Sequence, residues 1–530
     1  MKNRLCWMMA AGLAAAAAYA VETKTWTQSE AAEFEKGSLK GLALSSDGRL
    51  SLAPSWKELF DAASPHLWCA ASGPAGELYA GGADGKVYLL DAKGKGKVLA
   101  TLEGGAVHAL AVSRKGELFA AVSPEAKVYR IDPTGKASHF ATLKARYVWA
   151  LVFASDGSLY AATGDPGQIH KIGADGKAQI FFDAEEAHVR ALASDGKGNL
   201  IAGTEPGGVV LRVSPQGEGF VLHQTARREV TAVVVAADGT VYASASGNRG
   251  AAPAVIPSMP SAPVPVPTAQ PAGPQVQVAV TQRPVTPPPT VAPGATPGGA
   301  DVYRISTDGE PRRIWQNAQV TVYALALDKD GKVLAGTGNQ GRIYRIDSDF
   351  RSTRLTDAEP QQITALASAP GGALMAVTAN PAKIFQLGPG TEKSGLIESD
   401  LLDAGMFTYW GRLRHEGDAN GGSITLETRS GNLDRAEKNW SSWTPVEAAK
   451  GDRISAPPAR FLAWRATLSA AADGRSPVLR LVEAAYQAKN LSSSFRAAPP
   501  DVSFRGGSWG FRRGNHDLRQ RLDRRALARL

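Results

Sequence analysis

Hydrophobic and polar residues alternate in short segments over most of the chain. Apolar runs such as YVWALVFA and SLYAATG are separated by turns that carry an Asp-Gly pair, for example Asp156-Gly157 and Asp238-Gly239. Alternation of this kind, bounded by glycine-containing turns, predicts β-strands joined as hairpins. A third run of the type VYRID and a fourth such as ASHFATL complete each unit. Each unit is therefore predicted to be a four-stranded antiparallel meander.

These units repeat along the chain. The first strand of each unit carries a small residue in the same column: Cys69, Ala109, Ala150, Ala191, Ala232, Ala324 and Ala365. The spacing is 40 or 41 residues, except for one interval of 92, which is 41 plus an insertion of 51. Such a period, without helical segments, favours an all-β, seven-bladed β-propeller over a solenoid. Residues 41–53 match only the first two strands of a unit, either as an incomplete eighth blade or as a segment across the edge of the ring.

The repeat carries a resemblance to known proteins. Through phrases such as LYAATGDPGQIHKI and VLAGTGNQGRIYRID, residues 36–400 resemble the secreted bacterial β-propellers of the broad WD-repeat, NHL and YVTN-like group. The resemblance implies a scaffold. Members of this group include binding platforms, sensor ectodomains and a few lyases and lactonases, so the fold does not decide the function.

Two further regions differ in composition from the repeats. Residues 248–300 hold 14 prolines and only two charged side chains, which predicts a disordered, proline-rich insertion between the second and third strands of the fifth blade. From residue 401 the period ends. Alternating segments such as GSITLETRSGN predict a β-sandwich over residues 401–490, which resembles galactose-binding-like modules. In it, Trp410 and Trp464 are expected in the core, and Trp440 and Trp443 on an exposed platform.

The net charge of +9 is concentrated at the two ends of the chain. Residues 491–530 contain nine Arg and three Asp, and Lys2 and Arg4 add two charges, so residues 5–490 carry only +1. A nucleic-acid groove needs a basic cluster on the fold itself, so we expect no nucleic-acid partner. The arginine-rich tail is predicted to be disordered, with a short basic amphipathic helix as the alternative.

The N-terminal segment reads as an export signal. Residues 1–20 combine a basic start, an Ala- and Met-rich apolar stretch and the triplet Ala18-Tyr19-Ala20, which predicts cleavage after Ala20 and a secreted or periplasmic protein. No later segment is apolar enough to span a membrane. Cys69 is then the lone cysteine of the mature chain, so no internal disulfide forms, and its apolar strand predicts a buried, inert thiol.

Candidate functional residues gather at the starts of the first strands, which would surround one mouth of the propeller channel. Two columns there hold an unusual share of aromatic and titratable side chains: His66, Trp68, His108, Tyr147, Trp149, His188, Arg190, Glu229 and Tyr323. Loops between second and third strands would add Asp84, Asp165, Glu205 and Asn339 on the same face. A concave mouth with such groups is the expected ligand site.

The sequence favours binding over catalysis. It shows no H-x-H or HExxH spacing for a metal and requires no cofactor, although it leaves the presence of a metal open. We therefore expect a monomeric, non-catalytic scaffold that binds an extracellular or periplasmic protein, a glycan or a small molecule. The alternative is a metal-assisted lyase or lactone hydrolase in which His108, His188 and Glu229 act as ligands or general base.

Overall fold

The structure is a computed structural model that describes residues 22–248, 298–436 and 439–489. Residues Thr23–Gln487 form one compact unit. The described part is all-β apart from one short helix, α2 (Ala31–Phe34), and two single turns of 3-10 helix (Pro370–Gly372 and Ala448–Lys450). Across the described ranges, no helix is long and apolar enough to cross a membrane. The predicted signal segment, the insertion and the arginine-rich tail lie outside the described residues.

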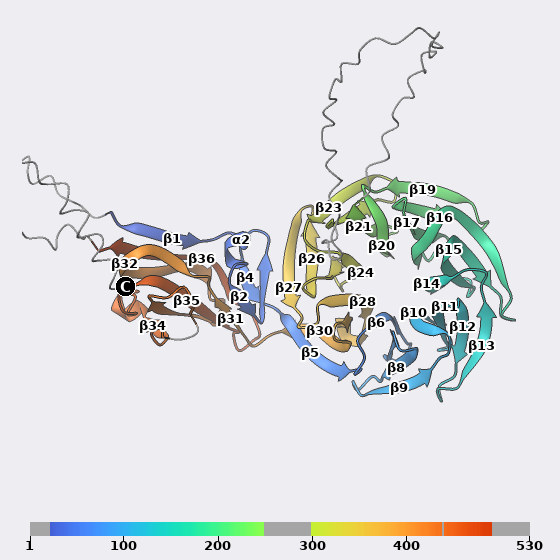
Figure 1. Cartoon of the computed structure of the whole chain (residues 1–530), viewed down its shortest axis with the longest axis horizontal. Coiled ribbons are helices and arrows are strands. Elements are labelled where there is room, and N and C mark those ends of the chain that lie inside the picture. The colour runs from blue at the N-terminus through green and yellow to red at the C-terminus, as the bar shows by residue number, and fades with distance from the viewer. Residues whose placement is uncertain (1–21, 249–297, 437–438, 490–530) are drawn as a thin grey trace, which may run out of the picture. The chain divides into compact units, whose positions relative to one another are not determined.

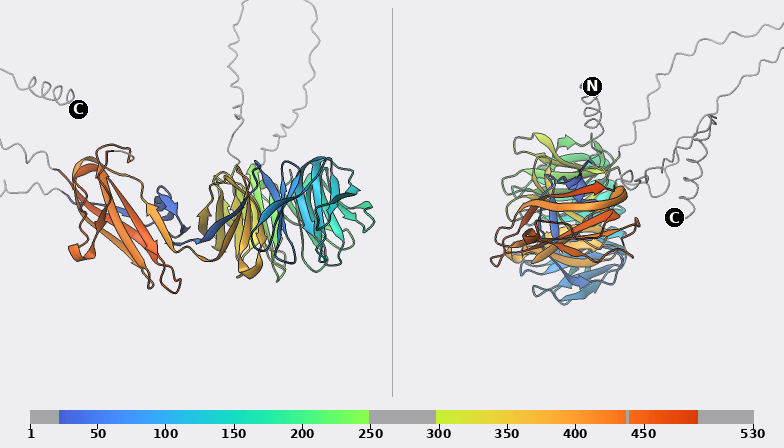
Figure 2. Two further views of the ribbon diagram at one scale, coloured as in Figure 1. Left: turned by 90° about the horizontal axis from the view of Figure 1, so that it is seen from below. Right: turned by 90° about the vertical axis from the view of Figure 1, so that its left-hand side faces the viewer.

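The repeats form a β-propeller around a central channel (Figure 1). The strand that carries the aligned small residue lies next to the channel in every repeat: β6 (Leu67–Ser72), β10 (Gly105–Val112), β14 (Tyr147–Phe153), the second half of β16 (Ala178–Ser194), β20 (Arg227–Val235), β24 (Val322–Leu327) and β28 (Gln362–Ser368). Seen edge-on, the strands run across the thickness of the ring, so their ends lie on its two faces (Figure 2).

The remaining strands of the ring continue outward from the channel. The second strands are β7 (Leu78–Gly82), β11 (Leu118–Pro124), β15 (Leu159–Ile172), β17 (Leu200–Glu205), β21 (Val241–Asn248), β25 (Val333–Thr337) and β29 (Leu374–Ala379). The outer strands are β8 (Lys86–Leu90), β9 (Gly96–Thr101), β12 (Lys127–Ile131), β13 (Ala137–Thr142), β18 (Val209–Val213), β19 (Gly219–Gln224), β22 (Ala300–Ile305), β23 (Pro311–Asn317), β26 (Arg342–Ser348), β27 (Arg351–Asp357) and β30 (Lys383–Thr391). Small alanines between neighbouring inner strands let the sheets approach closely at the centre.

The expectation of seven or eight separate blades is wrong, because only five sheets lie wholly within the ring. Four of them have four strands and one has six. The third and fourth repeats merge into one sheet because two of their strands are continuous. β15 spans the second and third strand positions of the third repeat, and β16 spans its fourth position and the first position of the fourth repeat, with register shifts between them. The strands β24–β27 belong instead to a 14-stranded sheet that leaves the ring.

The ring is closed by a strand from before the first repeat. β5 (Pro54–Asp61) pairs antiparallel with β30, so segments from the two ends of the repeat region share one sheet. Trp56 of β5 stacks on Phe385 of β30 with ring centroids 4.6 Å apart. This pairing ties the two ends of the repeat region together within one sheet, so the ring cannot open at this junction without breaking the ladder between β5 and β30.

Residues 41–53 do not complete the ring. They form β3 (Leu42–Ser45) and β4 (Leu50–Leu52); β3 pairs with the outer strand β27, and β4 pairs with β36 (Val478–Ala488). Of the two alternatives left open by the sequence, the structure shows the segment across the edge of the ring.

The C-terminal strands share a core with the N-terminal segment. They are β31 (Ser394–Glu398), β32 (Leu402–Asp418), β33 (Ser423–Gly431), β34 (Thr444–Val446), β35 (Ala459–Ser469) and β36, joined by β1 (Lys24–Gln28) and β2 (Ser38–Lys40). Trp464 is buried in this core, as predicted, and Trp410 packs against it. Trp440 and Trp443 are partly buried, and the guanidinium groups of Arg429 and Arg465 lie 4.4 and 4.6 Å from the Trp443 ring centroid, so less ring surface is open there than a sugar platform requires.

Candidate functional site

A β-bulge lies in every strand next to the channel. In β10 the register moves from the pair Val107–Val122 directly to Ala109–Ala121, which leaves His108 without a ladder partner. The same shift occurs in the other six strands, at Trp68, Trp149, Arg190, Thr231, Tyr323 and Thr364. Bulges redirect a side chain without ending the strand. Here the two neighbours of His108 are buried in the ring while His108 itself lines the channel mouth.

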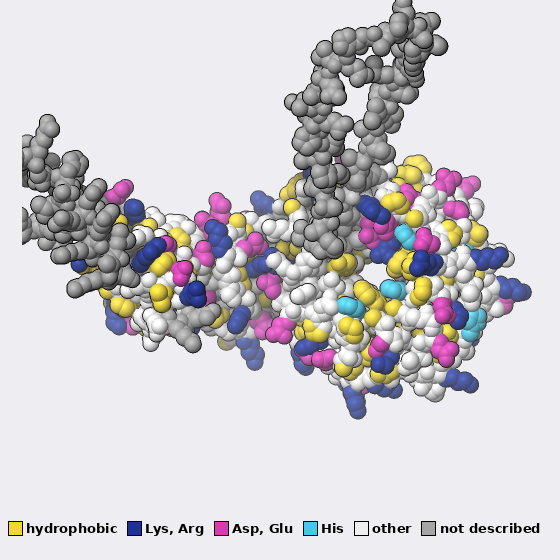
Figure 3. Space-filling model, in the orientation of Figure 1, with side chains coloured by type: hydrophobic (Ala, Val, Ile, Leu, Met, Phe, Trp, Pro, Cys, Tyr) yellow, Lys and Arg dark blue, Asp and Glu magenta, His cyan; other side chains and the backbone are white. Residues whose placement is uncertain are grey.

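These side chains surround a cavity of about 470 Å³ at the channel mouth. Figure 3 shows it as a hollow at the centre of the ring, with histidine and hydrophobic side chains at its rim. Seven of the nine predicted residues line it, and four further residues join them: His66, Trp68, His108, Trp149, Arg190, Glu229 and Tyr323, with Thr231, Gln362, Thr364 and Asn380. A cavity of this size suits a small organic ligand.

One half of the mouth is a chain of aromatic rings. His66 packs on Trp68, and Trp68 stacks on His108, with centroids 5.0 and 5.5 Å apart. His108 meets Trp149 edge to face at 5.4 Å. Tyr147 and His188 do not line the cavity. They pack on Trp149 instead, and the Trp149 indole N–H lies 3.3 Å from Nδ1 of His188, so these two predicted site residues support the wall.

The opposite half of the mouth is ionic but close to neutral. The Nε of Arg190 donates to Oε1 of Glu229 at 2.7 Å and lies 3.8 Å from Glu205, which in turn pairs with Arg228. The Arg190 guanidinium also lies 3.9 Å from the Trp149 ring centroid, a cation–π contact. Two arginines and two glutamates therefore alternate, and the local charges compensate each other.

Burial changes the acid–base chemistry of two mouth residues. It lowers the pKa of His108 to about 4, with the positive charge of Arg190 as the second cause. Burial and the nearby Glu229 carboxylate raise the pKa of the Tyr323 phenol. Neither group therefore exchanges protons readily near neutral pH. Cys69 is partly rather than fully buried, in contrast to the prediction. Burial still raises the pKa of its thiol to about 12, which agrees with the predicted inertness.

The low pKa of His108 predicts a pH-dependent stability. Between pH 6.5 and about 4 the unfolded chain binds a proton at this position that the folded protein does not, so stability falls as the pH falls through this window. Replacing His108 with Gln removes this contribution, and we expect the loss of unfolding free energy between pH 7 and pH 4.5 to shrink by about 2 kcal/mol. Urea unfolding at several pH values measures it. His139→Gln, at an exposed position, is the control and should keep the pH dependence of the wild type. If His108→Gln and His139→Gln show the same dependence of unfolding free energy on pH, the assignment to His108 is wrong.

Four lining residues are absent from the predicted set, namely Thr231, Gln362, Thr364 and Asn380, and several predicted residues lie outside the lining. Asn380 lines the cavity from the loop after β29, and its phrase Thr378-Ala-Asn-Pro parallels Thr163-Gly-Asp-Pro, a signal that was available. Of the four predicted loop residues, Glu205 joins the ionic chain, while Asp84 pairs with Lys86 away from the lining. Asp165 and Asn339 do not line the cavity either.

The ends of the proline-rich insertion lie on the same face as the mouth. In the ladder of β20 and β21, Arg227 pairs with Asn248, and Glu229 pairs with Ser246. Asn248 is the last described residue before the insertion, and its ladder partner Arg227 is two positions from the lining residue Glu229. The insertion itself, including its predicted disorder, lies outside the described residues. Its position between β21 and β22, the second and third strands of the fifth repeat, is as predicted.

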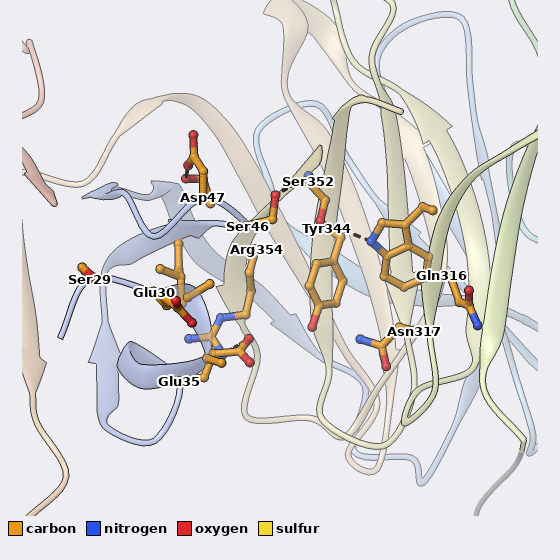
Figure 4. Close-up of a pocket in the computed structure, with 15 residues that line it drawn as sticks. Ser29, Glu30, Glu35, Ser46, Asp47, Gln316, Asn317, Tyr344, Ser352 and Arg354 are labelled. Carbon is orange, nitrogen blue, oxygen red and sulfur yellow. Dashed lines mark hydrogen bonds and ion pairs between the residues drawn. The ribbon is translucent and has the colours of Figure 1, made fainter. Parts of the chain in front are cut away.

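A second cavity of about 480 Å³ lies between the N-terminal segment and the sixth repeat (Figure 4). Its charged groups already have partners: the buried Arg354 lies 3.6 Å from both Glu35 and Asp357, and the Trp315 N–H donates to Ser352 at 3.3 Å. These pairs hold the segment on the ring. The channel mouth is the better ligand site because two buried ring nitrogens in its lining, Nδ1 of His66 and Nε1 of Trp68, have no hydrogen-bond partner among the described residues.

No three His, Cys, Asp or Glu side chains in the described ranges come together in a group that could hold a metal ion. The set named for the alternative hydrolase or lyase, His108, His188 and Glu229, therefore does not converge. His188 is engaged with Trp149, and Glu229 with Arg190.

Comparison with known proteins gives only distant structural similarities. No family model and no curated protein matches the chain. Among solved structures, the chain is similar to a streptogramin B lyase, with 14% identity over 63% of this chain and 98% of that one and a TM-score of 0.47. A virginiamycin B lyase from Staphylococcus aureus is 12% identical over 63% of this chain and 99% of that one, with a TM-score of 0.47. The WD40 β-propeller domain of Doa1 is 11% identical over 63% of this chain and 96% of that one, with a TM-score of 0.44. Similarities this low indicate neither a ligand nor a reaction for this chain.

Proposed function

We propose that this protein is a ligand-binding β-propeller that holds its ligand at the channel mouth and does not transform it. The proposal rests on the state of the titratable and charged side chains at the mouth. Three groups suited to chemistry are occupied or unfavourable: Arg190 and Glu229 are engaged with each other, and His108 has a lowered pKa. A general base works best with a pKa near the operating pH, which His108 lacks.

The remaining lining is suited to recognition. Trp68 and Tyr323 present aromatic surface, and the side-chain amides of Gln362 and Asn380 have no hydrogen-bond partner among the described residues. Pockets that bind small ligands combine such apolar surface with a few polar groups that fix orientation. As further parts of the proposal, the protein acts outside the cytoplasm after removal of residues 1–20, and residues 401–490 form an accessory β-sandwich module.

A ligand screen by thermal shift tests the binding site. We expect compounds that raise the melting temperature of the wild type, and we expect the double variant Trp68→Ala/Tyr323→Ala to lose that shift, because both side chains point into the cavity. The matched control is Tyr409→Ala, which removes an exposed aromatic side chain outside the ring. Equal shifts in the wild type and the double variant would remove the mouth as the site.

Incubation of each bound compound with the protein separates binding from catalysis. We expect the compound to be recovered unchanged, as followed by NMR. Turnover that requires an added divalent cation and is lost in His188→Ala would instead establish the metal-assisted lyase or hydrolase.

A further inference from the structure

We infer that the ligand of the channel mouth is a neutral saccharide, an inference that rests on the proposed binding function. The first argument is the geometry of the aromatic wall. Neighbouring rings from His66 to His188 have centroid separations between 4.8 and 6.1 Å. Inserting a flat aromatic ligand between two rings requires about 7 Å, twice the optimal carbon–carbon contact distance. The wall therefore accepts a ligand on one side only.

A one-sided aromatic surface suits the C–H face of a sugar ring. The face of an aromatic ring carries the negative part of its quadrupole, and it attracts the weakly positive C–H groups of a pyranose. Trp68 has fewer contacts than Trp149, because His66 and His108 are its ring neighbours. The Trp149 ring is contacted by His108, Tyr147, His188 and Arg190, so Trp68 is the better candidate for this contact.

The second argument is the kind of polar group left without a partner. Gln362, at the start of β28, and Asn380, in the loop after β29, both line the cavity, and each amide both donates and accepts hydrogen bonds. The described residues give neither amide a hydrogen-bond partner. Vicinal sugar hydroxyls also donate and accept, so paired amides and hydroxyls satisfy each other. An apolar aromatic ligand would leave both amides unpaired, which is costly once water is excluded.

The third argument is charge. Arg190 and Glu229, the two charged side chains of the lining, are paired with each other. An acidic sugar would have to compete with the Glu229 carboxylate for Arg190 and would pass close to Glu205. A neutral saccharide keeps the pair intact, and it requires no additional counter-charge.

Calorimetric titration of the intact protein with two panels of compounds tests this inference. The first panel holds neutral oligosaccharides of hexoses and N-acetylhexosamines, and the second holds uronic-acid oligosaccharides and flat heteroaromatic compounds. We expect one-to-one binding from the neutral panel. The affinity should stay constant between about 0.01 M and 1 M ionic strength, where screening lengths fall from about 30 Å to about 3 Å, because no net charge is recognised.

Variants separate the contributions of amide and ring. Gln362→Leu keeps the size of the side chain and removes its hydrogen bonds, so we expect about a tenfold loss of affinity for the saccharide. Trp68→Ala should abolish measurable binding. Gln216→Leu, an exposed turn position remote from the lining, is the matched control and should leave the affinity unchanged.

The possible failures are distinguishable. Tight binding of a heteroaromatic or acidic compound that is lost in Trp68→Ala would overturn the saccharide inference while the proposed binding function stands. Saccharide binding that survives both Trp68→Ala and Gln362→Leu would place the sugar elsewhere and would overturn the assignment to the mouth. Absence of binding from both panels would count against the inference and the proposed function together.

Discussion

Replacing Arg227 with Ala is expected to cost about 3–5 kcal/mol of unfolding free energy. The Arg227 Nε donates to Oδ2 of Asp301 at 2.8 Å, and the Asp301 side chain is only 1% exposed. The Tyr303 hydroxyl is the next contact of this carboxylate, at 3.4 Å. Without its cation, the carboxylate stays buried beside a neutral phenol, and desolvation is no longer offset. Urea denaturation measures the loss.

Two comparisons make this first prediction specific. Arg414→Ala removes an exposed partner of Glu483 and should change stability by no more than about 1 kcal/mol, since exposed ion pairs are weak. The double variant Arg227→Met/Asp301→Leu should recover much of the loss, because it removes both buried charges. If Arg227→Ala lowers the unfolding free energy by as little as Arg414→Ala does, the Asp301 carboxylate is hydrated and the prediction is wrong.

Replacing Trp464 with Ala is expected to cost about 3–5 kcal/mol in the C-terminal region. Its side chain is 1% exposed, packs edge to face on Phe34 with centroids 6.4 Å apart, and donates its N–H to Oε1 of Gln28 at 2.8 Å. The substitution leaves a cavity at the centre of this core. Hydrogen exchange of the β35 and β36 backbone amides should accelerate, while exchange in β10 and β14 of the ring stays as in the wild type.

The contacts of Trp464 also predict a long-range effect of Gln28, which lies in β1. Gln28→Ala should destabilise the same strands by about 1–3 kcal/mol, because the indole N–H then stays buried without an acceptor. Lys24→Ala, at the exposed start of β1, is the control. Unchanged exchange in Gln28→Ala would mean that the N-terminal strand contributes little to this core.

The repeat and the residues at the mouth were predictable because both follow from one period in the sequence. A small residue every 41 positions identifies the strand nearest the channel, and the residues beside it then fall at one mouth. The pairing of Arg190 with Glu229 joins equivalent strands of neighbouring repeats, 39 residues apart, and no pattern within one repeat reveals it. Tyr147 and His188 were expected in the lining, but they pack against Trp149 and do not line the cavity.

Other features were beyond the sequence for physical reasons. The pairing of β5 with β30 joins segments more than 300 positions apart, and the β5 segment PSWKELFD carries no sign of the repeat. The merging of the third and fourth repeats depends on a ladder between β15 and β16 that continues through Gly164 and Gly167, on both sides of the expected loop at Asp165. A hydrogen-bond ladder at such a position is decided by backbone geometry that composition does not report.

The seven bulges give the ring an unusual kind of modularity. At each bulge a side chain that faces the channel is excluded from the ladder, while its predecessor, such as Val107 or Val148, is fully buried and holds the sheets together. Substitution of a bulge residue therefore changes what the channel mouth presents, while the buried residue before it keeps its place between the sheets. A combinatorial library at these seven positions would behave like a set of hypervariable positions on a fixed frame, so that specificity can drift or be redesigned while the scaffold stays the same.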